Sequence, residues 1–465
     1  MNTYLKSNNL LKTHDDKMND LSPFFTPKSV LIVGASRNEF TFNWQIIKNL
    51  RELSYKGEIF ILNPNADDIL GVKCYNSLKN LPKIPELCIV LLMKNILETI
   101  EDLADFGVKH CIIQSDLSVS SNEHEIISQI KQIANKSKML IIGPGSIGLI
   151  NTSNMFTSSI IPVRRHVIQN HRRNRTNGSL SFFAQSGGLS GALGWWNPIQ
   201  EFPISKIIHI GDSINVSDAE MIHFLFDDLE TQVISLYLRS LSQDLIDVIS
   251  SHSTRKPVLY KYVGEDTPLL EELRNTLAIE VKNYIELFEY AKVFLWCPPP
   301  KGNSIGIIGP SSGAIYLVIS EMRNSEIVLA SLNSRTKKVI LEHVGGSTSP
   351  EGNPVDYWPP KKFIGTDVCN VYYVSSNALL EDNKVDALLL ALEFFSEIEF
   401  DFGIFSSIQK RFPHKPIIAL LIMAEKEGRE RIIACANQLH IPVFIDEVER
   451  AIRAYSAFIH YHLRK

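Results

Sequence analysis

The chain has 465 residues, which is enough for two to four domains with cores of their own. Hydrophobic residues make up 45% and charged residues 21%, and the net charge of -4 gives no reason to expect nucleic acid as a partner. No window has the apolar length of a membrane span. The six cysteines form no Cys-x-x-Cys pair, so neither a disulfide framework nor a metal site is indicated. We therefore expect a cytoplasmic location.

The chain begins with a polar stretch and then alternates between strand and helix patterns. Residues 1–20 carry charges throughout and lack the apolar core of a signal peptide, so we expect a mobile tail. Apolar strands that alternate with amphipathic helices predict a parallel, doubly wound sheet in a domain of residues 21–160. Its expected strands are Ser29–Val33, Glu58–Leu62, Leu87–Leu92, Lys109–Ile113 and Met139–Ile142, with helices at Gln45–Leu53, Ile96–Phe106 and Glu123–Ile133.

Small residues follow three of these strands. They are Gly34-Ala35-Ser36, Asn63-Pro64 and Gly143-Pro144-Gly145-Ser146. Because ligands of such sheets bind at the carboxyl ends of the strands, we expect Ser36, Asn63 and Gly143 on one edge. An NAD site is not indicated, because the glycine pattern after Gly34 is incomplete and Asn63 stands where a ribose-binding acid is expected.

A basic stretch separates the first unit from the second. Arg164 to Arg175 lies in a segment with five arginines and two histidines between Pro162 and Gly178. We interpret residues 161–178 as a solvated basic linker, in preference to a binding patch.

Residues 179–300 repeat the alternation of strands and helices. Expected strands are Leu180–Ala184, Lys206–Ile210, Val233–Leu238 and Pro257–Tyr262. The first ends at Gln185-Ser186-Gly187-Gly188, where a helix begins. Unpaired N–H groups and the helix dipole at such a turn favour an anion such as phosphate. A capped turn without a ligand is the alternative.

A third unit is expected over residues 301–465. It follows Cys297-Pro298-Pro299-Pro300, which is a stiff breaker and a predicted linker. Its expected strands are Ser304–Ile308, Ile327–Ala330, Val385–Ala391, Pro416–Ile422 and Ile441–Ile445, and a helix from Asp446 to about His462 closes the chain. The chain is therefore predicted to form three consecutive doubly wound α/β domains.

Several motifs, in this order, resemble the α subunit of ADP-forming acyl-CoA synthetases, the acetate–CoA ligase relatives of succinyl-CoA synthetase. Pro27–Ser36 is similar to the opening strand and CoA loop of that family, and Asn63-Pro64 to the end of its second strand. The other matching segments are Ile142–Asn151, which resembles a Gly-Pro-Asn-x-x-Gly element, Gln185–Leu189, which resembles the turn that faces a phosphohistidine, and Gly352–Asp356 and Val385–Leu389, which resemble the third domain.

The resemblance implies a Rossmann-like CoA-binding domain followed by two flavodoxin-like domains. It implies that acid, CoA and ATP are interconverted with acyl-CoA, ADP and phosphate through an acyl phosphate and a phosphohistidine. The residues expected to bind coenzyme A are Gly34, Ala35, Ser36, Asn63, Pro64, Gly143, Pro144 and Gly148, and those expected to bind phosphate are Gln185, Ser186, Gly187 and Gly188.

The resemblance also implies partners. ATP or ADP with Mg is expected only through an ATP-grasp subunit of the β type, because all three units of this chain are already assigned. A hetero-oligomer that acts on a small carboxylic acid or its acyl-CoA is therefore expected, without nucleic acid or membrane as a partner.

The chain departs from the family pattern at the phosphohistidine relay. The family places its phosphorylated His in a loop after the strand that matches Pro257–Tyr262, whereas Gly264–Val293 contains no His. The family also has a Glu that orients the imidazole, and Arg239 occupies that position. An arginine cannot accept the imidazole proton, although it could bind a phosphate.

A third departure lies in the expected CoA loop. The family has a glycine a few residues past Ser36, and this chain has Phe40, Phe42 and Trp44 instead. We expect these side chains to crowd a diphosphate that approaches the backbone.

Two other histidines could replace the missing one. His252 precedes the strand and is predicted to end a helix, and His209, beside Gly211-Asp212, is interpreted as a strand-end residue. No residue is therefore assigned as catalytic or metal-binding. Three hypotheses stay open: a ligase α subunit with an altered relay, a catalytically silent regulatory subunit that binds CoA or acyl-CoA, and an acyl or carbamoyl transferase on the same scaffold.

Overall fold

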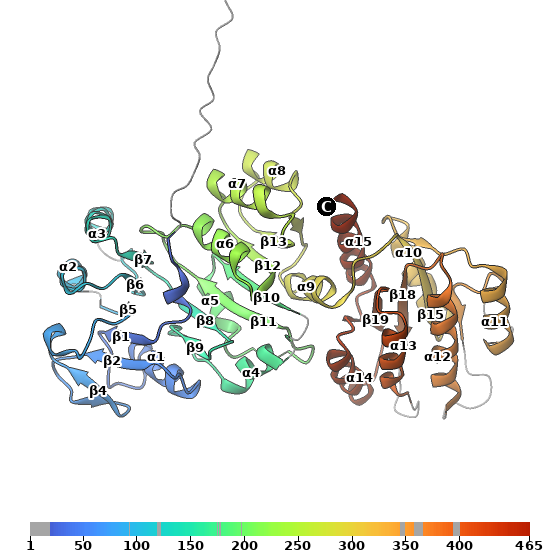
Figure 1. The fold of residues 1–465 in the computed structure, drawn as a ribbon, viewed down its shortest axis with the longest axis horizontal. Helices are drawn as coiled ribbons and strands as arrows, with labels where there is room; N and C mark the ends of the chain where they lie inside the picture. Colours follow the sequence, from blue (N-terminus) through green and yellow to red (C-terminus); the bar gives the residue numbers. More distant parts are fainter. Residues whose placement is uncertain are drawn as a thin grey trace, which may run out of the picture.

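Three α/β units lie side by side along the chain, from the blue unit to the orange and red unit of Figure 1. A computed structural model describes residues 19–92, 94–118, 122–173, 175, 178–196, 198–344, 349–357, 366–393 and 400–465. The expected tail lies outside the described residues except for its last two positions. Asn19 donates to Glu220 (3.0 Å), and the Asp20 carbonyl lies 3.0 Å from the Nε2 atom of His110.

The first sheet is doubly wound around a fully buried central strand. Its described strands have the order β3-β4-β2-β1-β5-β6-β7, and every neighbouring pair is parallel except β3–β4. Val30 and Ile32 of β1 pack into one core with α1, while Leu31 and Val33 pack into another with α2 and α3. Successive side chains of β1 therefore pack into the cores on opposite faces of the sheet. The bounds are β1 (Ser29–Val33), β2 (Glu58–Leu62), β3 (Asp68–Ile69), β4 (Val72–Tyr75), β5 (Leu87–Val90), β6 (His110–Ile113), β7 (Leu140–Ile142), α1 (Phe42–Glu52), α2 (Ile96–Phe106), α3 (Glu123–Ser137), η1 (Ser22–Phe24) and η2 (Leu78–Asn80).

The second sheet begins earlier in the chain than predicted. Its described strands have the order β14-β13-β12-β10-β11-β8-β9, and β8 (Gly148–Asn151) runs antiparallel to β11 (Ile204–His209). Strands β8 and β9 thus lie before the predicted boundary at residue 160 but pair with the second sheet, and the first sheet ends with β7. The other elements are β9 (Phe156–Thr157), β10 (Ser179–Ala184), β12 (Thr231–Leu238), β13 (Val258–Tyr262), β14 (Ile279–Glu280), α5 (Gly187–Ala192), α6 (Asp218–Asp227), α7 (Gln243–His252), α8 (Pro268–Arg274) and α9 (Glu286–Trp296).

The segment that was interpreted as a solvated linker contains a packed helix, α4 (Arg165–Arg173). Val167, Ile168 and His171 are buried on one face. The two ring nitrogens of His171 lie 3.2 Å from the Phe202 carbonyl and 3.0 Å from that of Leu193. The linker prediction is corrected for this reason: buried side chains spaced three and four residues apart hold the segment to the second unit, and the arginines occupy its outer face.

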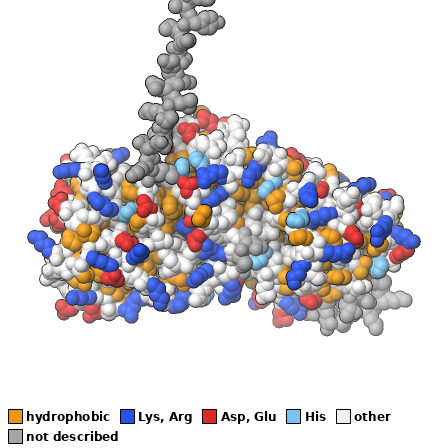
Figure 2. Space-filling view, in the orientation of Figure 1, with side chains coloured by type: hydrophobic (Ala, Val, Ile, Leu, Met, Phe, Trp, Pro, Cys, Tyr) orange, Lys and Arg blue, Asp and Glu red, His pale blue; other side chains and the backbone are white. Residues whose placement is uncertain are grey.

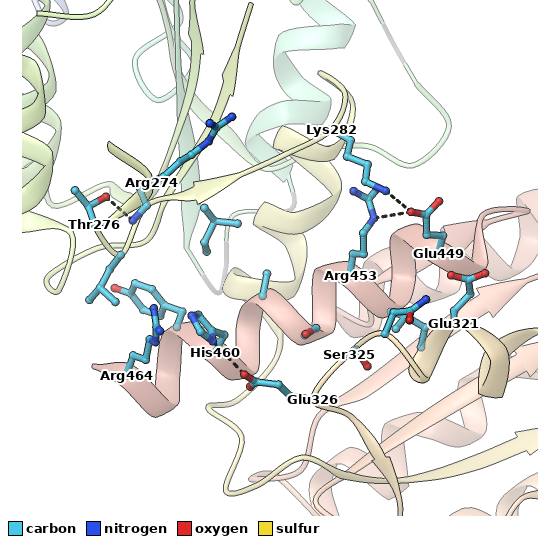
Figure 3. A pocket seen from close by; sticks show the side chains of 18 residues that line it. Arg274, Thr276, Lys282, Glu321, Ser325, Glu326, Glu449, Arg453, His460 and Arg464 are labelled. Atoms are coloured by element: carbon cyan, nitrogen blue, oxygen red, sulfur yellow. Dashed lines mark hydrogen bonds and ion pairs between the residues drawn. The ribbon is translucent and has the colours of Figure 1, made fainter. Parts of the chain in front are cut away.

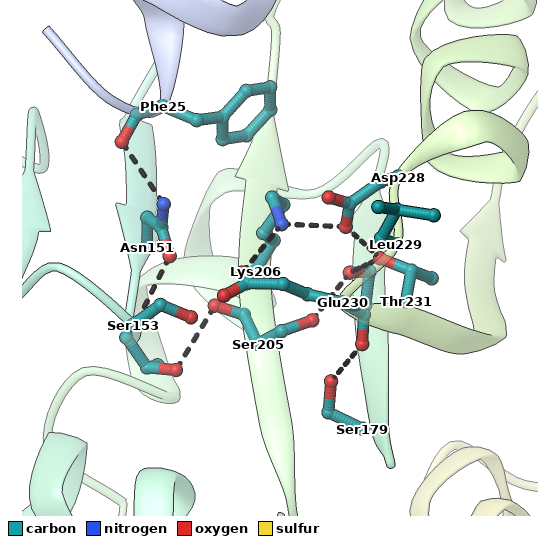
Figure 4. A network of polar contacts seen from close by, with 12 residues as sticks. Phe25, Asn151, Ser153, Ser179, Ser205, Lys206, Asp228, Leu229, Glu230 and Thr231 are labelled. Atoms are coloured by element: carbon teal, nitrogen blue, oxygen red, sulfur yellow. Dashed lines mark hydrogen bonds and ion pairs between the residues drawn. The ribbon is translucent and has the colours of Figure 1, made fainter.

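A polar network lies at one end of the second sheet, opposite the end that carries the Gln185 turn (Figure 4). The buried Lys206 donates to Asp228 (2.6 Å) and Glu230 (3.1 Å). Asn151 donates to the carbonyl of Phe25, which lies before β1 in the chain. The start of the first unit is thereby attached to the second, and the two units share one hydrophobic core.

The third sheet repeats the parallel pattern. Its described strands have the order β16-β15-β18-β19-β20, and β17 pairs with β15. The buried Asn353 accepts from the Ile307 N–H and donates to the carbonyls of Ile305 and Ala330, so it holds β15 beside the end of β16. The elements are β15 (Ser304–Gly309), β16 (Val328–Leu329), β17 (Val355–Asp356), β18 (Ala387–Leu392), β19 (Ile417–Leu421), β20 (Val443–Ile445), α10 (Ser312–Met322), α11 (Ser334–Val344), α12 (Thr366–Glu381), α13 (Phe405–Arg411), α14 (Lys426–Leu439), α15 (Val448–Arg464) and η3 (Phe402–Ile404).

Helices α9 and α15 join the second and third units through buried charges. Glu286 accepts from Arg453, and Glu289 lies 3.4 Å from Arg450, both arginines being on α15. Lys292 donates to Asn437 of α14 (3.1 Å). Burial lowers the pKa of Lys292 to about 7 and raises that of Glu289 to about 7. The linker after α9 therefore connects two units that are packed together.

No helix among the described residues has both the length and the apolar character needed to cross a membrane.

Candidate functional site

A cleft of about 330 Å³ opens at the carboxyl edge of the first sheet, where β1, β2 and β5 end. Strands β2 and β5 flank β1 on opposite sides, so the cleft lies where the order of strands reverses. Open parallel sheets bind their ligands at this kind of position. The lining residues are Val33, Gly34, Ala35, Leu62, Asn63, Pro64, Asn65, Leu78, Leu92, Thr99, Asp102 and Leu103.

Gly34 allows the backbone to form one wall of this cleft. Its φ of +87° is a conformation that other residues adopt only with strain. A Cβ atom there would lie 2.7 Å from the Cδ2 atom of Leu92 and 3.3 Å from the backbone carbon of Leu91. A side chain at this position would therefore displace Leu92, which lines the cleft.

Asn63 holds two turns of the cleft together. Its amide donates to the Ala35 carbonyl (3.0 Å), and its Oδ1 atom accepts from the Asn65 N–H (2.8 Å). Asn43 of α1 donates to the Gly34 carbonyl (2.6 Å). Two asparagines therefore fix the glycine turn and the end of β2, and neither adds a negative charge to the cleft.

The three aromatic residues of the β1–α1 segment do not line the cleft. Phe40 is 90% exposed and Phe42 59% exposed, and Trp44 lines a separate cavity on the outer side of α1. The expectation that they crowd a bound diphosphate is therefore corrected for this cleft, because none of the three is among its lining residues.

The predicted Gly143–Gly148 loop lies at the carboxyl edge of the same sheet but outside the cleft. A Cβ atom on Gly143 would lie 2.1 Å from the Ile113 carbonyl oxygen, and one on Gly211 would lie 2.2 Å from that of Pro144. The N–H of Asp212 donates to the Pro144 carbonyl (2.8 Å). The loop thus forms a tight contact between the carboxyl edges of the first and second sheets. Neither this loop nor Ser36 is among the residues that line the cleft.

The turn from Gln185 to Gly188 joins β10 to α5. A Cβ atom on Gly187 would lie 2.3 Å from the Cγ1 atom of Ile147, whereas one on Gly188 would meet nothing within 4 Å. Ser190 is the first residue of α5 whose N–H bonds back, to the Ser186 carbonyl (3.1 Å). The preceding N–H groups have no partner within the helix, so they can bind an anion from the side of Gly188.

The side chain of Gln185 is engaged within the protein. Its Oε1 atom accepts from the N–H groups of Arg239 (2.6 Å) and Ser240 (2.9 Å), and its amide donates to Asp218. Burial raises the pKa of Asp218. Gln185 therefore ties the ends of β10, β12 and α6 together, and phosphate contacts from this turn would come from its backbone.

His209 lies beside this turn at the end of β11. Its Nδ1 atom accepts from the Ile147 N–H (3.0 Å), so the proton of the neutral ring is on Nε2. Burial lowers the pKa of His209 to about 4. A histidine that takes a phosphoryl group on Nε2 needs its lone pair there, and the Ile147 contact holds the opposite tautomer.

The burial of His209 predicts a pH-dependent stability. The unfolded chain binds a proton on this ring below its usual pKa of 6.5, and the folded chain does so only near 4, so the contribution of His209 falls as pH drops through this window. His209→Gln retains an acceptor for the Ile147 N–H but does not titrate. Between pH 6.5 and 4, we expect the free energy of unfolding of this variant to fall by about 3 kcal/mol less than that of the original chain. Thermal unfolding of both proteins across this range checks it, and parallel curves would contradict it.

The loop after β13 is short and folds back on the protein. Residues 263–267 connect β13 to α8, and the Tyr262 hydroxyl donates to the Glu265 carbonyl (2.9 Å). A Cβ atom on Gly264 would lie 2.3 Å from the Arg239 carbonyl oxygen. His252 is on the other side of β13, at the end of α7, as predicted. No imidazole reaches the Gln185 turn from this loop.

A larger cavity of about 760 Å³ lies between the second and third units (Figure 3). Glu449 bonds to Lys282 and lies 3.5 Å from Arg453, and His460 lies 3.5 Å from Glu326. Because most of its charged side chains pair with one another, this cavity offers little free charge to a ligand.

Sequence reasoning missed two polar residues of the cleft. Thr99 and Asp102 extend from α2, and the sequence signal was their spacing of three residues on one face of a predicted helix. It also missed Ile147 and Asp218, whose places beside the Gln185 turn come from the packing of distant segments.

Two protein families match the chain. Residues 28–152 match the CoA binding domain, which contains the cleft, and residues 177–294 match the succinyl-CoA ligase like flavodoxin domain, which contains the Gln185 turn.

Known proteins resemble the chain over most of its length. It is 28% identical to acetate–CoA ligase (ADP-forming) II of Archaeoglobus fulgidus over 81% of this chain and 58% of that protein. It is 25% identical to subunit alpha of acetate–CoA ligase (ADP-forming) II of Pyrococcus furiosus over 94% of this chain and 97% of that subunit. The structure of acetyl-coenzyme A synthetase 1 of Ca. Korarchaeum cryptofilum has the same fold, with a TM-score of 0.82 and 22% identity over 96% of this chain and 98% of that one. The chain thus spans less than two thirds of the Archaeoglobus protein and nearly all of the Pyrococcus subunit.

Proposed function

Because the chain is an alpha-type member of the ADP-forming acyl-CoA ligase family, we propose that it is the CoA-binding chain of such a ligase, acting on a small carboxylic acid or its acyl-CoA. The observation that carries this proposal is the cleft at the ends of β1, β2 and β5, which lies within the matched CoA binding domain. Gly34, Ala35, Asn63 and Pro64 would contact CoA there, and Ser36 would lie at its edge.

The nucleotide chemistry is proposed to reside in a partner. Relatives named as alpha subunits support a β-type partner, which we propose to be an ATP-grasp chain that binds ATP or ADP with Mg in a hetero-oligomer. Gly143, Pro144 and Gly148 would then shape the contact between the CoA domain and the Gln185 turn. The free cysteines favour a reducing cytoplasm as the location.

The transfer step is proposed to avoid a phosphohistidine in this chain. The CoA thiolate would attack the carbonyl carbon of an acyl phosphate made by the partner, forming the C–S bond and breaking the C–O bond to phosphate. The backbone N–H groups of Gly187 and Gly188 would receive the departing phosphate. Arg239, which directly follows the neighbouring strand β12, would add positive charge for this phosphate.

Incubation with ATP, partner and acyl-CoA, supplied separately and then together, is expected to leave no phosphohistidine in this chain. The reason is the short loop after β13 together with the tautomer of His209. Intact mass measured at neutral pH, where phosphohistidine survives, checks this expectation. A stoichiometric phosphohistidine anywhere in this chain would contradict the proposal, and its disappearance in His209→Gln would place it on that ring.

The missing relay also favours a second candidate, a catalytically silent CoA-binding regulatory chain. The two candidates differ when acetyl phosphate and CoA are supplied without ATP. A chain that supports thiolysis would form acetyl-CoA, alone or with its partner, whereas a regulatory chain would bind CoA in calorimetry without accelerating this reaction.

A further inference from the structure

A third cavity, of about 410 Å³, lies outside both sites. It is formed on the outer side of α1, against the turn between β3 and β4 and the first residue of α4, so it bridges the first and second units. Its volume is in the range of small-molecule sites. The lining residues are Trp44, Lys48, Arg51, Glu52, Leu70 and Arg165.

This cavity carries an excess of positive charge. Lys48, Arg51 and Arg165 face a single carboxylate, that of Glu52, and within the described part of the chain none of the three forms an ion pair. Residues 126–200, which include α4, contain neither Asp nor Glu. Figure 2 shows Lys and Arg side chains along the lower edge of the molecule, over α1 and α4. In the cavity between the second and third units, by contrast, Arg274, Lys282 and Arg453 all have carboxylate partners.

The cations are held in place by neutral groups. Arg165 donates to the Ser54 hydroxyl (2.6 Å), and Arg51 donates to the Leu70 carbonyl at the β3–β4 turn. The Lys48 ammonium lies 5.0 Å from the centre of the Trp44 ring. The guanidinium groups are thereby positioned without losing their charge, which favours the binding of a multivalent anion.

We propose that this cavity binds a nucleoside polyphosphate, with its phosphates on Lys48, Arg51 and Arg165 and its base against Trp44. The indole supplies a face for a planar ring, and the three cations match two or three phosphate groups. The Trp44 ring beside three cations favours a ligand that combines a planar ring with phosphates over the surface of an acidic protein. Such a site goes beyond the proposed function, because it would place a nucleotide effector on the CoA-binding chain itself, at the seam between its first two units.

The test is calorimetric titration of the full chain at low salt with ADP, inorganic tripolyphosphate and adenosine. ADP is expected to bind saturably and more tightly than tripolyphosphate, with affinity that falls as salt is added. Lys48→Ala combined with Arg165→Ala should weaken ADP by about tenfold or more. The matched control is Arg172→Ala combined with Arg173→Ala, which removes two exposed charges from α4 outside the cavity. It should change the affinity for ADP by less than about twofold.

Trp44→Ala removes the ring against which the adenine base of ADP is proposed to lie. It should weaken ADP by a larger factor than tripolyphosphate, because tripolyphosphate loses only the support that the ring gives to Lys48. Absence of saturable ADP binding at about 5 mM, or equal losses in both double variants, would overturn the proposal. Equal affinity for ADP and tripolyphosphate would overturn the nucleotide assignment. CoA binding at the first-sheet cleft should survive in every one of these variants, so failure here is distinguishable from failure of the proposed function.

Discussion

Gly34→Ala is expected to weaken CoA binding by about 10- to 100-fold. The new methyl group would lie 2.7 Å from the Leu92 Cδ2 atom, so Leu92, which lines the cleft where the ligand is proposed to bind, would have to shift. The backbone there also has a φ of +87°, which adds about 1–2 kcal/mol of strain. Calorimetric titration with CoA measures the loss.

The matched control for this prediction is Gly107→Ala. Gly107 ends α2 with a φ of +100°, so the substitution brings the same backbone strain, and its nearest new contact is Ile84 Cδ1 at 3.2 Å. It does not line the cleft. We expect CoA affinity within about twofold of the original chain, with a similar loss of stability. Equal losses of affinity in both variants would mean that stability, not the cleft, controls binding, and would contradict the proposed site.

Glu286→Ala is expected to destabilise the contact between the second and third units by about 3 kcal/mol or more. Glu286 is fully buried on α9 and accepts from the Arg453 guanidinium, the Lys282 N–H and the Asn283 amide. Its removal leaves Arg453 and the Lys282 N–H without this partner. With a shift of about 2–4 °C per kcal/mol for units of this size, the corresponding melting transition should fall by about 6–12 °C.

Glu449→Ala is the control, because Glu449 lies 3.5 Å from the same Arg453 but is 48% exposed. Exposed ion pairs contribute about 0–1 kcal/mol, so a shift of about 0–4 °C is expected. Scanning calorimetry of the three proteins at low salt compares them. A drop for Glu449→Ala as large as that for Glu286→Ala would show that burial does not set the strength of this contact.

The central strands were predictable from sequence. The expected bounds of β1, β2 and α2 agree with the structure residue for residue, because the strands are continuous apolar runs and the helix has a regular apolar face. The alternation of these elements also predicted three doubly wound units, and three sheets are observed. These features depend on local pattern, so no knowledge of distant contacts was needed.

The edges of the units were not predictable in the same way. β8 belongs to the second sheet only because it pairs with β11, more than fifty residues later. α4 was hidden by the composition of its segment, since the five arginines between Pro162 and Gly178 suggested solvent and only the packing of Val167, Ile168 and His171 shows an inner face. A strand's partner and a helix's buried side are decided by long-range contacts.

For the candidate site, the sequence by itself determined which turns lie at the carboxyl ends of strands: Gly34-Ala35, Asn63-Pro64, Gly143-Pro144 and Gln185–Gly188 all do. Only the tertiary structure decided which of them share a cavity. Gly34 and Asn63 meet because β1 and β2 are neighbours, whereas Gly143 follows β7, three strands away, and packs on the second sheet instead. The tautomer of His209 is likewise set by the Ile147 N–H, which reaches the ring only because β8 pairs with β11. Strand ends follow from local periodicity, but their neighbours follow from strand order, which the chain settles only by folding.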